Sequence, residues 1–213
     1  MTLFARVASG LIEGDFICLI TDREGFEFLS SAQLRDGKTN REDVDQYLRR
    51  MELRLTTTRD GGAFFAAHAD IDGEGKKAAK KRFTELKNNL RPMVSFMEMV
   101  MRVTGDDNAI SAGQKLDLNR MMARIGANAG LQEQLRKTAA DTGITSKDGS
   151  DRDRLFRIVK RFKDDSYLRL INPESEIYMF TGRIEWLQEA IEFLMLHDKI
   201  SEEDSEFDQR FET

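Results

Sequence analysis

Residues 150–181 read SDRDRLFRIVKRFKDDSYLRLINPESEIYMFT, and this stretch decides the fold. Its first half has apolar residues at i, i+3, i+4 and i+7, the pattern of a single buried helix face. These residues are Leu155, Ile158, Val159 and Phe162. Two short predicted strands follow, joined by the turn sequence Asn172-Pro173-Glu174-Ser175. A helix that leads into a two-stranded hairpin is typical of the end of a winged-helix domain.

The same order of patterns occurs earlier in the chain. A helix with one apolar face is again followed by Leu-Arg-Leu, at residues 53–55 here and at 168–170 in the later stretch. Asp60-Gly61-Gly62 then predicts the turn, and residues 63–67 the return strand. The apolar helix positions are Val44, Tyr47, Leu48 and Met51. The repeat therefore predicts a duplicated module.

Smaller features support the duplication. Thr39 with Glu42 fits a capping box, and Ser150 with Asp153 fits one that uses the shorter acid. A phenylalanine lies ten residues after the second leucine of each Leu-Arg-Leu, at Phe65 and Phe180. The second copy differs by an insertion, residues 163–166, between helix and hairpin.

We therefore predict a mainly α fold with small β-hairpin wings, arranged as tandem winged-helix domains. The N-terminal domain is expected over residues 1–70 and the C-terminal domain with a terminal helix over 76–197, after a linker at 70–75. Residues 198–213 are expected to form a disordered acidic tail. Further helices are predicted at residues 3–11, 23–30, 76–103, 116–125 and 131–140, and a terminal helix with an apolar stripe at Ile184, Leu187, Ile191, Leu194 and Met195.

Composition limits the class of protein. The 213 residues carry a net charge of −5 and are 40% apolar, which is enough for one or two modest cores. No apolar run approaches the roughly 20 residues of a membrane span, and the start of the chain has no basic lead-in or cleavage site. We therefore expect a cytoplasmic protein. Its single cysteine, Cys18, stands in an apolar run and is expected to be a buried small hydrophobe.

Catalytic motifs are absent from the sequence. The two histidines, His68 and His197, have no ligand-type neighbours at zinc spacing. There is no phosphate loop that ends in Lys-Ser or Lys-Thr, and no Gly-x-Ser-x-Gly. We expect no enzyme activity, no cofactor and no metal ion, and interpret the chain as a binding protein.

Basic residues gather in two places. The helix at 151–163 carries Arg154, Arg157 and Arg161 opposite its apolar face, where contacts with DNA phosphates would be made. The full set of candidates for DNA binding is Arg152, Arg154, Arg157, Lys160, Arg161, Lys163, Lys80, Lys81 and Arg82. The alternative is an ordinary solvated helix face with i, i+4 pairs. Asn and Gln are missing from the helix at 151–163, so we expect contact with double-stranded DNA to be non-specific.

Residues 167–193 add a resemblance. The hairpin followed directly by Thr181-Gly182-Arg183-Ile184 and a terminal helix resembles the MukE/MksE proteins, the kite subunits of bacterial MukBEF-type and MksBEF-type condensins. The resemblance implies a non-catalytic, nucleoid-associated homodimer of tandem winged-helix subunits. It also implies binding to the middle region of an MksF-like kleisin, which bridges the heads of an MksB-like SMC ATPase that entraps DNA. The expected role is chromosome organisation or plasmid defence.

Two other classes of protein stay open at this point. One is a stand-alone dimeric winged-helix transcription regulator, which would bind specific DNA without a kleisin. The acidic net charge and the lack of base-reading residues count against it. The other is an enzyme such as a nuclease, which would need a metal-binding carboxylate cluster that the sequence does not suggest.

Overall fold

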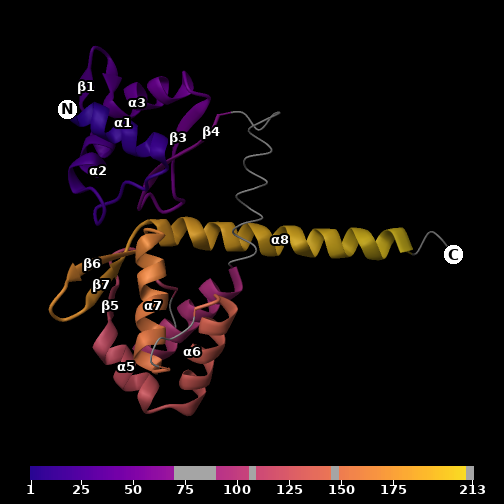
Figure 1. The fold of residues 1–213 in the computed structure, drawn as a ribbon. Coiled ribbons are helices and arrows are strands. Elements are labelled where there is room, and N and C mark those ends of the chain that lie inside the picture. The colour runs from indigo at the N-terminus through magenta and orange to yellow at the C-terminus, as the bar shows by residue number, and fades with distance from the viewer. Residues whose placement is uncertain (70–89, 106–108, 145–148, 210–213) are drawn as a thin grey trace.

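Two separate hydrophobic cores organise the molecule (Figure 1). The structure is a computed structural model that describes residues 1–69, 90–105, 109–144 and 149–209, with side chains as far as residue 196. One core is built from residues between 3 and 66, and the other from residues between 90 and 194. We name the corresponding parts the N-terminal unit (residues 3–68) and the C-terminal unit (residues 90–209). The predicted linker at 70–75 lies outside the described residues.

The N-terminal unit is three helices and two small antiparallel hairpins. Its elements are α1 (Leu3–Glu13), α2 (Arg23–Ser30), β1 (Leu34–Arg35), β2 (Lys38–Thr39), α3 (Asn40–Arg49), β3 (Leu53–Thr57) and β4 (Phe64–His68). Thr39 and Glu42 form the predicted capping box at the start of α3. The helices pack around fully buried Val44 and Leu48 of α3, whereas Tyr47, which shares their predicted apolar face, is exposed.

One carboxylate joins α3 to the hairpin that follows it. Asp45 Oδ1 accepts a hydrogen bond of 2.8 Å from the Leu55 amide, and its Oδ2 accepts one of 2.7 Å from Arg49 Nε. Burial by itself would raise the pKa of Asp45, but the hydrogen bonds from Arg49 and from Leu55 outweigh it and the pKa is lowered. The ionised form of Asp45 is therefore the one that the fold stabilises.

The C-terminal unit has a larger core and shares with the N-terminal unit a helix followed by an antiparallel hairpin. Helical residues 90–104 are followed by β5 (Lys115–Asp117), α5 (Leu118–Gly126), α6 (Ala129–Asp141), α7 (Asp151–Asp164), β6 (Leu168–Asn172), β7 (Ile177–Phe180) and α8 (Arg183–Gln209). The strands form an antiparallel sheet in the order β5-β7-β6. Ser150 caps α7, since its side chain accepts from the Asp153 amide as predicted. The described residues are thus largely helical with small antiparallel sheets, as the sequence indicates.

The structure corrects four local predictions. Leu116 was expected in a helix but lies in β5, because it pairs with Tyr178 of β7 and Asp117 then caps α5. Lys163 and Asp164, expected in an insertion, continue α7. Phe65 and Phe180 are not equivalent: Phe180 pairs with the first leucine of its Leu-Arg-Leu, and His68 has that position in the first copy because its turn is longer. Met195 is exposed because it lies beyond the core that holds Ile184.

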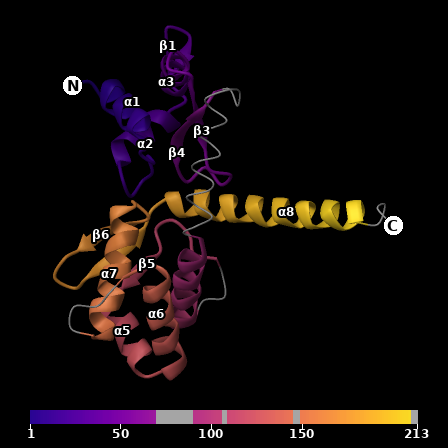
Figure 2. The same cartoon turned by 45° about the vertical axis from the view of Figure 1, so that its right-hand side comes forward.

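The last helix, α8, crosses the boundary between the units and then extends beyond both (Figures 1 and 2). Its 27 residues correspond to about 40 Å of helix. Ile184 and Leu187 are fully buried in the core of the C-terminal unit. The predicted acidic tail therefore starts in helical backbone, because a helix anchored on a core propagates at the gain of one hydrogen bond per residue. Residues 210–213 lie outside the described part of the chain.

Candidate functional site

The first turn of α8 is where the two units meet. The Gly182 amide donates to Cys18 Sγ across 3.4 Å, and Cys18 is fully buried, as the sequence predicted. A Cβ at Gly182 would lie 2.7 Å from Ala63 Cβ and 2.7 Å from the Gly62 carbonyl oxygen. Real Cβ contacts are not this short, so only glycine lets the backbones of the two units approach this closely.

Aromatic rings and one arginine surround this contact. The Arg183 guanidinium lies 5.1 Å from the ring centroid of Phe16 and 5.0 Å from that of Tyr167, so it joins a ring of each unit. Trp186 packs against Phe16 with centroids 5.7 Å apart. Burial raises the pKa of Tyr167, and the neighbouring Arg183 opposes that rise. Within the described residues, Arg183 Nε is buried without a hydrogen-bond partner.

The other two residues of the Thr-Gly-Arg-Ile sequence, Thr181 and Ile184, make contacts at the start of α8. The buried hydroxyl of Thr181 donates to the Ser166 carbonyl oxygen at 2.7 Å, which ties the start of α8 to the turn after α7. Ile184 fills the core of the C-terminal unit. Gly182 and Arg183 thus contact the N-terminal unit, while Thr181 and Ile184 anchor the start of α8 in the C-terminal unit.

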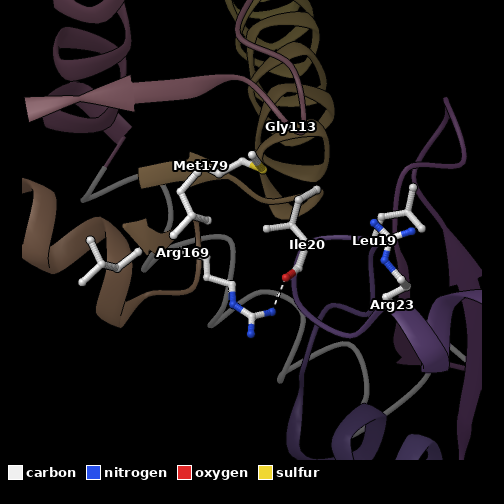
Figure 3. A pocket seen from close by; sticks show the side chains of 8 residues that line it. Leu19, Ile20, Arg23, Gly113, Arg169 and Met179 are labelled. Carbon is white, nitrogen blue, oxygen red and sulfur yellow. Dashed lines mark hydrogen bonds between the residues drawn. The ribbon is translucent and has the colours of Figure 1, made fainter. Parts of the chain in front are cut away.

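A pocket of about 550 Å³ opens between the units beside this joint (Figure 3). Its two walls come from different units. The Arg169 guanidinium bridges them, since it donates to the Ile20 carbonyl oxygen and, at 2.9 Å, to that of Thr21. The lining residues are Leu19, Ile20, Arg23, Gly113, Arg169, Leu170, Ile171 and Met179.

One wall of the pocket is the three-stranded sheet, lined by Arg169 and Ile171 of β6 and by Met179 of β7. Among the described strands β6 pairs only with β7, and the pairing shifts register between Leu170 and Asn172. Ile171, in that irregular section, is 40% exposed, and Leu19 on the opposite wall is also exposed. The pocket thus offers apolar side chains and two arginines, and the edge strand β6 lies in its wall, features suited to an extended peptide. Nothing in it resembles a catalytic centre.

The basic residues of α7 form ion pairs with neighbouring acidic side chains. Arg152 pairs with Glu176, Arg154 with Asp151, Arg157 with Asp153, Lys160 with Asp164 and Arg161 with Asp165. The i, i+3 and i, i+4 spacing of four of these pairs was visible in the sequence.

The outward face of α7 also differs from the one predicted. The side chain of Arg154 is 24% exposed, whereas that of Lys160 is 59% exposed. Arg152, Phe156, Lys160 and Lys163 form the exposed face, and Arg154, Arg157 and Arg161 flank it. The cause is the broad apolar face of the helix, which turns the flanking arginines partly towards the protein.

The remaining predicted sites fall into two groups. Lys80, Lys81 and Arg82 lie outside the described residues. Among the residues that the structure describes, there is no group of three or more His, Cys, Asp and Glu side chains placed to hold a metal ion. No helix among them is both long and apolar enough to span a bilayer.

Comparison with known proteins gives the family. The family model described as condensin complex protein MksE matches residues 2–191. The chain therefore belongs to the MksE family, whose members are accessory proteins of condensin complexes, and the predicted resemblance is confirmed. No curated protein matches the chain. The family match gives no support to the stand-alone transcription regulator.

Proposed function

We propose that this chain is a kite-type subunit that binds a kleisin through the pocket between its two units, and through the kleisin joins an SMC ATPase. The pocket lined by Leu19, Arg169 and Ile171 is the observation that carries this proposal. A kleisin segment in extended conformation would pair with the free edge of β6 and place apolar side chains between the units. Arg23 at the pocket favours an acidic residue in that segment.

The order of elements supports a tandem winged-helix arrangement. In each unit a helix that supplies the core, α3 or α7, is followed by a hairpin that contains Leu-Arg-Leu. In each hairpin the first leucine pairs near the end of the return strand, with His68 in one and Phe180 in the other. Both features belong to the winged-helix plan, in which a third helix leads into the wing.

Apolar residues on the N-terminal unit support dimerisation there. Tyr47, in the last turn of α3, and Met51, two residues beyond its end, are exposed, and Phe4 of α1 packs edge-on against Tyr47 at 5.6 Å. An apolar cluster of this kind suits a symmetric interface, in which the same surface of each copy meets. Met51→Glu would then shift the protein from dimer to monomer in light scattering, and an unchanged mass would contradict the placement of the interface.

Binding of the kleisin has a matched test. Ile171→Ser removes an apolar side chain that is 40% exposed in the pocket, and Ile12→Ser removes one that is 41% exposed on α1. Titration calorimetry with the co-purified kleisin should give at least a tenfold weaker Kd for Ile171→Ser, equal to about 1.4 kcal/mol, and no change for Ile12→Ser. Equal affinity of both variants and wild type would place the kleisin elsewhere.

The chain's contact with DNA, as part of the same proposal, is non-specific and made by the exposed face of α7. Lys160 and Lys163 are exposed there, and surface ion pairs such as Lys160–Asp164 are weak enough to exchange a carboxylate for a phosphate. Within an SMC complex such a weak contact would add to entrapment of DNA without selecting a sequence. Chromosome organisation and plasmid defence are both consistent with non-specific contact of this kind.

A further inference from the structure

The turn of the first hairpin rests on α8. This turn joins β3 to β4 and is closed by a 2.9 Å hydrogen bond from the Gly61 amide to the Thr58 carbonyl oxygen. Thr58 is buried, and its hydroxyl oxygen accepts from the Ala63 amide at 3.1 Å while donating to Glu185 Oε2 at 2.8 Å. The base of this turn, at Thr58, is therefore covered by the C-terminal unit, whereas its tip at Arg59 and Asp60 stays exposed.

Three glutamates of α8 face this turn. Glu185, Glu189 and Glu192 are spaced i, i+4 and i+7, which places them on one side of the helix. Glu189 Oε1 accepts from the Arg59 backbone amide at 2.6 Å, and Glu192 Oε2 accepts from Arg59 Nη2 at 2.9 Å. The Arg59 guanidinium thus offsets part of the negative charge of Glu189, Glu192 and the nearby Asp60, which would otherwise repel each other more strongly.

The joint between the units therefore has two parts of different physical character. The contact of Gly182 with Cys18 and Ala63 is buried and apolar. The contact of Arg59 with Glu192 is open to water, since the two side chains are 65% and 57% exposed, and salt screens such pairs. The exposed contact of Arg59 with Glu192 can therefore open while the buried contact at Gly182 stays closed. Gly182 would then act as a hinge between the units.

We propose that Thr58, Arg59, Glu185, Glu189 and Glu192 form an interunit latch that fixes the orientation of the two units and, with it, the width of the pocket between them. The pocket's two walls belong to different units, so any rotation at Gly182 changes their separation. A closed latch keeps β6 and Leu19 at one spacing. An open latch lets the pocket widen to admit or release its occupant.

Distance measurements test the latch without any partner. Spin labels are attached at Leu34→Cys and Arg124→Cys, one exposed site in each unit, and Cys18 is kept because it is fully buried at the joint. The labelled protein is diluted with unlabelled protein to isolate distances within one chain. Wild type should give a narrow distance distribution at about 0.1 M salt that broadens at about 1 M. Arg59→Glu should give a broad distance distribution at both salt concentrations. The double variant Arg59→Glu with Glu192→Arg should again give a narrow distribution at low salt.

Arg6→Glu is the matched control, because Arg6 pairs with Asp22 and Glu24 inside the N-terminal unit. Arg59→Gln provides the same test if the charge reversal prevents folding. Broadening in the Arg59 variants alone supports the latch. Equal distributions in all variants, or broadening in Arg6→Glu as well, would overturn it.

Control of the pocket by the latch rests on the proposed function and is tested separately, by the dissociation rate of the kleisin. If the kleisin occupies the pocket, Arg59→Glu should change its dissociation rate at least threefold, and the charge-swapped pair should restore it. An unchanged rate with broadened distances would confine the latch to orientation and overturn its control of the pocket. Failure of wild type to bind a kleisin would remove the proposed function and leave the distance result standing.

Discussion

Gly182 is the residue on which the joint between the units depends. Its neighbours Cys18 and Ala63 are fully buried, and a methyl group there would meet backbone and Cβ atoms rather than flexible side-chain ends. Arg183, the next residue, spans the same boundary through its contacts with Phe16 and Tyr167. The Thr-Gly-Arg-Ile sequence that carries the family resemblance is therefore explained at this scale as a structural joint.

We predict that Gly182→Ala lowers the free energy of unfolding by about 1–3 kcal/mol, because the added methyl forces the units apart. Gly126→Ala, at the end of α5, is the matched control: it has open space around it, and its helical backbone should gain up to about 1 kcal/mol. Urea denaturation measures the free energy of unfolding of both variants. Equal stability of Gly182→Ala and wild type would show that the units are not in close contact at this residue.

At the scale of elements, α3 and its hairpin are joined by Asp45. Because its pKa is lowered on folding, Asp45 stabilises the fold above its unfolded pKa of about 3.9 and loses that effect as the pH falls through the folded pKa. We predict that Asp45→Asn is about 1 kcal/mol less stable at neutral pH and that its stability falls less steeply than wild type below about pH 4. Parallel stability curves in acid would contradict the role of the Asp45 carboxylate.

The α7 helix has an electrostatic prediction of its own. Lys160→Glu with Lys163→Glu should weaken binding to any duplex and flatten the plot of log K against log salt by about two units. Lys115→Glu with Lys137→Glu changes the net charge equally at exposed positions on β5 and α6. If both double variants weaken binding equally, overall charge and not the α7 face determines the affinity.

At the scale of the whole molecule, local patterns predicted most of the elements, and contacts between distant residues limited the rest. The helices α1, α2, α3 and α7 and both Leu-Arg-Leu hairpins follow from apolar spacing, caps and turn residues. Strand β5 was missed because three residues carry little pattern and its partner β7 lies about sixty positions away. The contact of Cys18 with Gly182 joins residues 164 positions apart, and nothing in either local sequence indicates the other.

In the candidate site, too, some features could be predicted from local sequence and others depend on contacts between distant residues. The basic residues of α7 are evident from composition, and the carboxylates that pair with two of them, Arg157 and Lys160, lie at i, i+4 spacing in the sequence. The pocket between the units was not predictable, since Leu19 and Ile171 come together only when two separate cores dock. Family resemblance predicted the class of partner but no residue that would contact it.

We propose that this chain works as a condensin subunit attached to a kleisin, and affinity purification from the native host tests this role. Wild type and Ile171→Ser would be purified in parallel, and the co-purifying chains identified by mass spectrometry. We predict that a kleisin and a large coiled-coil ATPase accompany wild type in near-stoichiometric amounts and are depleted from Ile171→Ser. Recovery of wild type alone, as a stable homodimer, would contradict the claim.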